Sequence, residues 1–161
     1  MGAACIDEVQ KGGEAAAAMV AIGTFLGGAS IEELSVAMGL THSTTVRLVD
    51  DLERRGEIAR EPGSDRRSVS IVPTNQGRRL AARILAAREE AVGDFLAPLS
   101  DAERGQLEGL LAKLLEAQVC EGADPGNLCR ICDAEACGHY EGRCPVTEAA
   151  KAMRSRGEAS G

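Results

Sequence analysis

The hydrophobic residues at the start of this chain recur with the three- and four-residue spacing of helices that bury one face. An Ala-rich apolar segment over 14–27 predicts a buried helix that ends at a pair of glycines. A second, short helix is expected to begin at Ser30, because Glu33 stands three residues later and completes a capping box. Gly39 ends the apolar spacing and predicts the end of that helix.

The next helix follows almost immediately. Thr41 or Ser43 can cap it, and apolar residues then recur every three positions as far as Gly56. Two short helices joined by a turn that contains glycine predict a helix-turn-helix.

The spacing changes to strict alternation after this helix. Val69 and Ile71 alternate with serines, and a Pro-Gly-Ser-Asp turn over 62–65 precedes them. This pattern predicts a β-hairpin, and a hairpin directly after a helix-turn-helix is a wing.

Two longer helices are predicted next. Thr74 can cap the first, and Pro98 closes it. Its apolar stripe consists of Leu80, Ile84, Ala87, Ala91 and Phe95. A second capping box over 100–103 opens a helix in which leucines recur every three or four residues to position 115.

The chain is therefore expected to be mostly α-helical with a small β-hairpin wing. We expect a winged helix-turn-helix with dimerisation helices over 13–119 and a cysteine-rich extension over 120–150 that begins as a linker. One further helix is predicted over 146–156, and 151–161 is expected to be largely a frayed tail.

Composition indicates in which compartment of the cell the protein is expected. None of the 161 residues is Trp, so the core must be aliphatic, and the longest apolar run is too short to span a membrane. No basic segment followed by an apolar one opens the chain, which predicts a cytoplasmic protein without a membrane partner. Cysteines clustered in that reducing compartment favour metal or redox chemistry over structural disulfides.

The distribution of charge points to nucleic acid although the net charge is −7. Residues 41–83 carry nine arginines and six acids, a local charge of +3. A basic middle flanked by acidic segments suits a polyanion that contacts one face of the molecule.

Candidate DNA-binding residues lie on the second helix of the helix-turn-helix, whose first turns enter the major groove. Arg47 can form a bidentate pair with guanine. Arg54 is placed for the helix dipole or a phosphate, and the wing arginines for the minor groove or the backbone. The full predicted set is His42, Ser43, Thr44, Thr45, Arg47, Arg54, Arg66 and Arg67.

These segments resemble the MarR family of winged-helix regulators. The resemblance rests on Ser30-Ile-Glu-Glu-Leu, on the stretches 43–56 and 65–77, and on Leu99-Ser-Asp-Ala-Glu-Arg, and it covers about residues 13–118. It implies a homodimer that binds a pseudo-palindromic double-stranded operator and represses, usually under control of a small organic effector. It also implies base reading by residues 43, 44, 45 and 47 and wing contacts from 65, 66 and 67.

Two features depart from that family. Few residues precede the Ala-rich segment, so the dimer must rely on the helices around 78–97 and 100–119 or on the tail. Four cysteines also follow the family-like region, and the family does not explain them: Cys129, Cys132, Cys137 and Cys144.

The cysteine spacing, C-x2-C-x4-C-x6-C, leaves three interpretations open. The block could hold an iron–sulfur cluster, a Zn(II) ion, or no metal, in which case the thiols would switch by forming disulfides. With Cys120 included, it is similar to the start of the WhiB-like iron–sulfur regulators. Cys120 and His139 are further possible ligands, and the acids Asp133, Glu135 and Glu141 are expected to raise the thiol pKa values.

The sequence thus predicts a DNA-binding transcriptional regulator, a repressor, whose cysteine block responds to redox state or metal. One alternative is a repressor released by a small organic ligand, with a purely structural cysteine–metal site. Another is a redox or metal-binding protein whose winged helix makes protein contacts. An enzyme is not expected, since no nucleophile elbow, paired catalytic carboxylates or phosphate-binding glycine loop is present.

Overall fold

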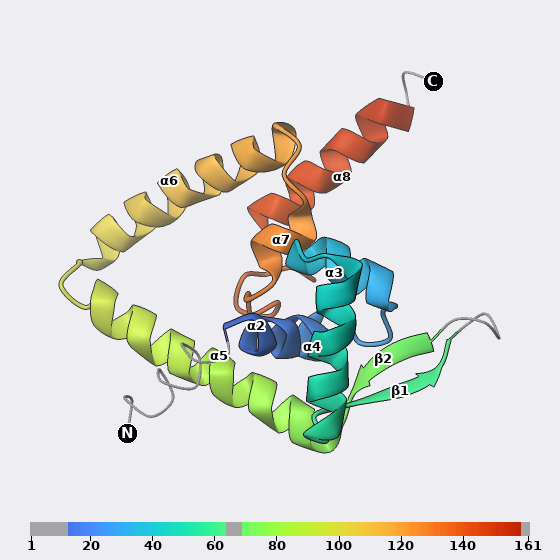
Figure 1. The fold of residues 1–161 in the computed structure, drawn as a ribbon. Helices are drawn as coiled ribbons and strands as arrows, with labels where there is room; N and C mark the ends of the chain where they lie inside the picture. The colour runs from blue at the N-terminus through green and yellow to red at the C-terminus, as the bar shows by residue number, and fades with distance from the viewer. Residues whose placement is uncertain (1–12, 64–68, 159–161) are drawn as a thin grey trace.

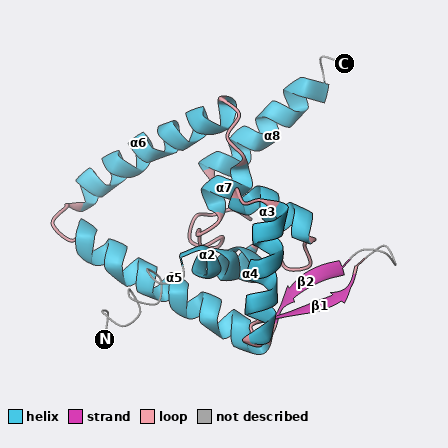
Figure 2. Ribbon diagram, viewed as in Figure 1, coloured by secondary structure: helices cyan, strands magenta, loops and turns pink. Residues whose placement is uncertain are grey.

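The computed structural model describes residues 13–63 and 69–158, in which helices surround one short hairpin (Figures 1 and 2). The elements in chain order are α2 (Gly13–Thr24), α3 (Ile31–Met38), α4 (His42–Arg54), β1 (Ile58–Pro62), β2 (Val69–Pro73), α5 (Asn75–Leu96), α6 (Asp101–Cys120), α7 (Pro125–Cys129) and α8 (Pro145–Glu158). None of the described helices is both long enough and apolar enough to cross a membrane.

Helix α2 lies at the centre of the main core. All six residues from Ala17 to Ile22 are buried, as expected for a helix that is apolar on every side. The helix ends at Thr24, three residues before the predicted glycine pair, because the amides of Phe25 and Leu26 both bond to the carbonyl oxygen of Ala21. The predicted buried helix is therefore confirmed, with an earlier end.

Helices α3 and α4 form the predicted helix-turn-helix. The Ser30 hydroxyl accepts from the Glu33 amide while the Glu33 carboxylate accepts from the Ser30 amide, which confirms the capping box. Gly39 adopts φ 65°, a left-handed conformation that favours glycine, and so turns the chain sharply into α4. Thr41, the first of the two proposed caps, is the N-cap of α4.

The hairpin projects from the body beside α4 (Figure 1). β1 and β2 are antiparallel, with Ile58 opposite Pro73 and Pro62 opposite Val69. Ile71 is fully buried and forms an isolated bridge with Ala29, which joins the hairpin to the start of the helix-turn-helix. The fold is therefore mostly α with a hairpin wing, as predicted.

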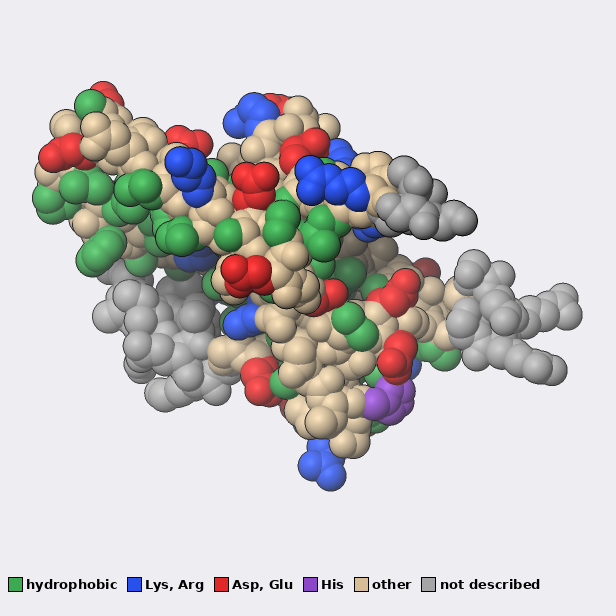
Figure 3. All heavy atoms as spheres, turned by 90° about the horizontal axis from the view of Figure 1, so that it is seen from above, with side chains coloured by type: hydrophobic (Ala, Val, Ile, Leu, Met, Phe, Trp, Pro, Cys, Tyr) green, Lys and Arg blue, Asp and Glu red, His purple; other side chains and the backbone are tan. Residues whose placement is uncertain are grey.

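Helices α5 and α6 diverge from a corner at 97–100 (Figure 1), with the predicted capping box at Ser100 and Glu103. The predicted stripe of α5 is half-buried at Leu80 and Ile84 but exposed near the corner, where Phe95 is 81% exposed. On α6 the leucines at 110, 111 and 114 are also exposed, and Figure 3 shows hydrophobic side chains gathered at this end of the molecule.

The cysteine-rich extension is more ordered than the sequence indicated. Residues 125–129 form α7, capped by the Asp124 carboxylate, where only a linker was expected. Helix α8 runs from Pro145 to Glu158, which confirms the helix predicted over 146–156. The tail that was expected to fray from 151 is helical as far as Glu158. A second small core joins α6 to α8 through Val119, Val146 and Ala149, with Cys144 buried among them.

Candidate functional site

The first turn of α4 presents a polar surface. His42, Ser43 and Arg47 are exposed, and Thr44 is half-buried. The Thr41 hydroxyl lies 3.2 Å from the Ser43 hydroxyl and 2.9 Å from that of Thr44, so a hydroxyl network orders the turn. His42 Nδ1 is 3.4 Å from a carboxylate oxygen of Glu32 on α3, and protonation of the imidazole would strengthen this contact.

Thr45 does not belong to this surface, and its prediction as a DNA-binding residue was wrong. Its side chain is 0% exposed, and its hydroxyl donates to the carbonyl oxygen of Thr41 at 3.1 Å. Position 45 falls on the face of α4 that packs on the core, beside Val49 and Leu52, because residues four and seven apart share one side of a helix. A Ser-Thr-Thr run masks that periodicity in the sequence.

Arg54 lies at the far end of α4 and is exposed. Its guanidinium donates to the Asp51 carboxylate at 2.7 Å. An exposed pair of this kind is worth little, roughly 0–1 kcal/mol, so the arginine remains able to exchange its partner for a phosphate.

The structure also shows a positioning residue that the sequence did not indicate. Arg60 on β1 donates to Asp50 at 2.6 Å and to Glu53, both on α4. This double ion pair fixes the hairpin against α4. The wing-tip residues Asp65, Arg66 and Arg67 lie outside the described residues.

The four clustered cysteines come together as two pairs of thiols that contact each other. Cys129, at the end of α7, lies close enough to Cys132 to affect its pKa, and Cys137 is placed likewise beside Cys144, which directly precedes α8. The Cys137 thiol donates to the carbonyl oxygen of Ala134 at 3.6 Å. Charge on Cys132, Cys137 or Cys144 would also raise the pKa of Cys129, so the four sulfurs share one small region.

Electrostatics differ between the members of the cluster. The hydrogen bond with Cys132 and burial raise the pKa of the Cys129 thiol. For Cys132, the hydrogen bond from Cys129 and the nearby Arg88 guanidinium lower the pKa to about 6, although burial and Asp133 oppose this. At Cys132 the increase in pKa caused by Asp133 is thus overcome, chiefly by the hydrogen bond from Cys129 and also by Arg88, which reaches the thiol from α5.

Cys144 is the most buried of the four. Burial alone would raise its pKa, but hydrogen bonds from the hydroxyl and amide of Thr147, and from the amide of Val146, hold it below its ordinary value. These donors stand at the start of α8, where free amides and the helix dipole favour a negative charge.

The two further possible ligands lie apart from the thiol pairs. Cys120 is exposed at the end of α6. His139 Nδ1 is 2.9 Å from the Thr147 hydroxyl, and its ring contacts those of Phe25 and Tyr140 edge to face.

Four soft thiol donors fit the chemistry of zinc or of iron–sulfur clusters. Among the described side chains, however, no group of three or more His, Cys, Asp or Glu is arranged as metal ligands would be. The four thiols therefore suit a metal by their chemistry, but they are not arranged as a set of metal ligands in this structure. The cofactor remains a prediction.

The cysteine segment is joined to the winged helix at several points. A methyl group added at Gly126 of α7 would meet Ala37 Cβ on α3 at 3.0 Å, so α7 and α3 pack at close range. The Tyr140 hydroxyl donates to the carbonyl oxygen of Thr24, 3.3 Å away. The extension is thus in contact with α2 and α3 rather than attached only through a linker.

Comparisons with known proteins agree with this geometry. A sequence model of the MarR family matches residues 13–68. A protein named as a transcriptional regulatory protein for the hcr operon of Thauera aromatica is 43% identical over 54% of this chain and 53% of its own. The transcriptional repressor MprA of Escherichia coli K12 is 34% identical over 52% of this chain and 48% of its own.

The chain therefore spans about half the length of these two curated relatives. Among solved structures, CouR from Rhodococcus jostii RHA1, crystallised with p-coumaroyl-CoA, superposes with a TM-score of 0.53 at 29% identity, covering 69% of this chain and 80% of CouR. The relatives are regulators of transcription and not enzymes, in agreement with the sequence prediction. The matched segment, the helix-turn-helix and the hairpin together show that the winged-helix region of this chain belongs to the MarR family of transcriptional regulators.

Proposed function

We propose that the protein is a homodimeric repressor that reads a pseudo-palindromic operator with α4 and the hairpin of each subunit. The observation that carries the proposal is the exposed polar first turn of α4, with Ser43 and Arg47 presented to solvent on a helix that the hairpin braces through Arg60. Two such helices about one helical turn of DNA apart would enter successive major grooves.

Repression and dimerisation have separate support. MprA, which is 34% identical to the matched part of this chain, is named a repressor. The exposed leucines of α6 form an apolar face, and a second copy of the chain that covered it would remove that face from water.

For the cysteine cluster we propose a sulfur-ligated metal, an iron–sulfur cluster or Zn(II), whose binding or oxidation changes DNA affinity. Its position supports a regulatory role, since α7 packs on α3 and α8 packs on α6. Cys129, Cys132, Cys137 and Cys144 would hold the metal, and Cys129 ends α7, the helix that packs on α3 of the helix-turn-helix. A coupling of roughly 1–3 kcal/mol would change DNA affinity by about 5- to 150-fold.

DNA binding is tested by selecting bound duplexes from random sequence and measuring affinity by fluorescence anisotropy. Arg47→Ala should weaken binding to the selected site about 10-fold or more and relax the preference at one base pair, because a bidentate contact is worth roughly 1–3 kcal/mol. Arg104→Ala, on α6, is the matched control and should bind as the wild type does. If no duplex is enriched, the winged helix would instead serve protein contacts.

The metal is tested by anaerobic purification, absorption spectroscopy and metal analysis. Cys129→Ser with Cys132→Ser should lose the metal, and Cys120→Ser, a thiol outside the two pairs, should retain it. Iron with visible charge-transfer bands would identify a cluster, and a colourless protein with zinc would identify a zinc site. If the wild-type protein contains no metal and its thiols interconvert with disulfides, the proposal of a metal is wrong and a thiol switch remains.

A second candidate is a small-molecule effector acting beside a purely structural cysteine site. It is favoured by CouR, whose crystal structure contains p-coumaroyl-CoA. Operator affinity that is unchanged across metal and redox states, but lowered by an organic ligand, would support this alternative over the sensor.

A further inference from the structure

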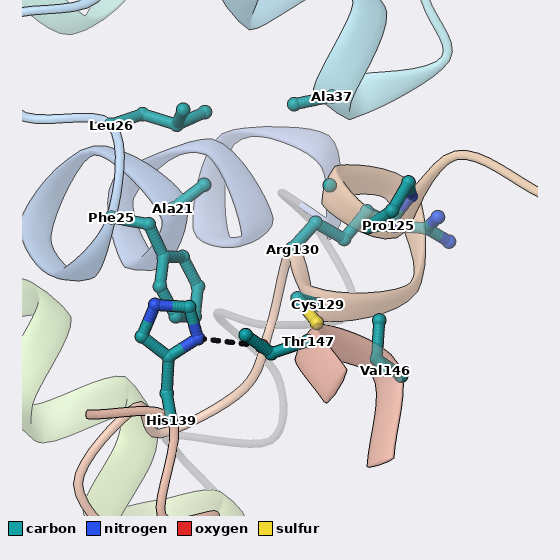
Figure 4. Close-up of a pocket in the computed structure, with 11 residues that line it drawn as sticks. Ala21, Phe25, Leu26, Ala37, Pro125, Cys129, Arg130, His139, Val146 and Thr147 are labelled. Carbon is teal, nitrogen blue, oxygen red and sulfur yellow. Dashed lines mark hydrogen bonds between the residues drawn. The ribbon is translucent and has the colours of Figure 1, made fainter. Parts of the chain in front are cut away.

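A cavity of about 140 Å³ lies between the winged helix and the cysteine segment (Figure 4). Ala21 and Phe25, from α2 and the residue that follows it, form one side, and Ala37 of α3 faces them. Cys129, His139 and Val146 of the extension close the other side. Most of the lining residues fall within 125–147 and so lie outside the family match over 13–68.

We propose that this cavity binds one small, uncharged aromatic ring. Its volume is similar to that of an engineered protein cavity of about 150 Å³ that takes up benzene. The lining is chiefly aliphatic and aromatic carbon, which favours an apolar occupant over water.

Aromatic side chains at the wall favour a ring over an aliphatic molecule of the same size. Phe25 and His139 already contact each other edge to face, with ring centroids 5.7 Å apart (Figure 4). An aromatic occupant can extend that arrangement, and aromatic pairs gain about 0.5–1.5 kcal/mol beyond the burial of their surface.

The charges around the cavity argue against an ionised ligand. Arg130 is the lining residue with a permanent charge in the described chain, and its guanidinium already donates to the Asn127 carbonyl oxygen at 3.0 Å and to the side-chain oxygen of Asn127. His139 Nδ1 is engaged with Thr147. A carboxylate placed among the aliphatic and aromatic carbon atoms of the lining would lose its hydration.

The test is a titration of the full-length protein with toluene, methylcyclohexane and benzoate, followed by methyl NMR signals of Ala37 and Val146. Toluene should shift both signals to saturation and bind about 2- to 10-fold more tightly than methylcyclohexane. Benzoate should bind more weakly than toluene. The titration requires no DNA, so its outcome is independent of the proposed operator binding.

Phe25→Leu removes the ring but keeps an apolar side chain, and it should abolish the preference for toluene over methylcyclohexane. Phe95→Leu, at the other phenylalanine of the chain, should keep that preference. Val146→Phe, which fills the cavity, should prevent toluene binding. This variant provides the test if Phe25→Leu does not fold. The absence of saturable toluene shifts, a preference that survives Phe25→Leu, or equal binding of benzoate would each overturn the proposal.

Discussion

Arg88, on the exposed side of α5, donates a hydrogen bond to the carbonyl oxygen of Ile131, which lies between the first two cysteines of the cluster. The same guanidinium lies near Cys132 and, after the hydrogen bond from Cys129, helps to lower the pKa of that thiol. One side chain thus joins the cysteine loop to the helix that continues directly from the hairpin.

Arg88→Gln should loosen the cysteine loop without disturbing the winged helix. The lost contact is exposed and worth about 1 kcal/mol, which corresponds to amide hydrogen exchange about 5-fold faster over residues 130–140. Hydrogen-exchange mass spectrometry can compare this segment with α2–α4, where rates should not change. Arg83→Gln, on the same helix, is the control, and equal effects of the two variants would show that the contact does not restrain the loop.

Thr45 and Ser43 should respond to substitution in opposite ways. Thr45→Val removes the buried hydrogen bond to Thr41 and should lower the free energy of unfolding by about 1 kcal/mol, with DNA affinity unchanged. Ser43→Ala should leave stability within about 0.5 kcal/mol and weaken DNA binding several-fold. Urea unfolding and fluorescence anisotropy measure the two effects. Weakened DNA binding by folded Thr45→Val would contradict the assignment of Thr45 to the core.

Local patterns were sufficient to predict most of the fold. The capping boxes at Ser30 and Ser100 are signals contained within four residues, and the structure confirms both. Gly39 and Gly56 likewise indicated the ends of α3 and α4, although α2 ends before its glycine pair. Such features depend on neighbouring residues, and tertiary contacts do not alter them.

The candidate site was less predictable, because its residues meet through long-range contacts. Thr45 is polar but faces the core, and only the packing of α4 shows this. Arg60 and Arg88 act on elements distant in sequence, so no local pattern indicates their partners. Helix α7 is only five residues long and depends on packing against α3.

Glu57 should make stability depend on pH. It is 7% exposed, and its Oε2 atom is buried without a hydrogen bond, although Arg55 Nε lies 3.9 Å away. Burial raises the pKa of this carboxyl, against the influence of Arg55. The folded state therefore holds the proton more tightly than the unfolded state, and ionisation lowers the free energy of unfolding as pH rises above about 4.5, the ordinary value.

Glu57→Gln should remove that penalty. The variant should match the wild type near pH 4 and become more stable by about 1 kcal/mol at neutral pH, since the buried charge is no longer present. Urea unfolding of both proteins between pH 4 and 8 measures the difference. A variant that loses stability relative to the wild type as pH rises would show that the carboxylate is favourable where it stands.

Leu114→Lys should weaken the proposed dimer. Leu114 is 63% exposed on α6, beside Leu110 and Leu111 on the same apolar face. Burying a leucine contributes about 1.5–3 kcal/mol, and a two-fold symmetric interface loses the contribution twice. The dimer dissociation constant should then rise by about 100-fold or more, since each 1.4 kcal/mol corresponds to about a factor of ten. Sedimentation equilibrium measures this change, and Gln106→Lys on the same helix should alter the dimer dissociation constant only slightly. A Leu114→Lys protein that stays dimeric at low micromolar concentration would place the dimer contact elsewhere, with the projecting helix α8 as the next surface to test.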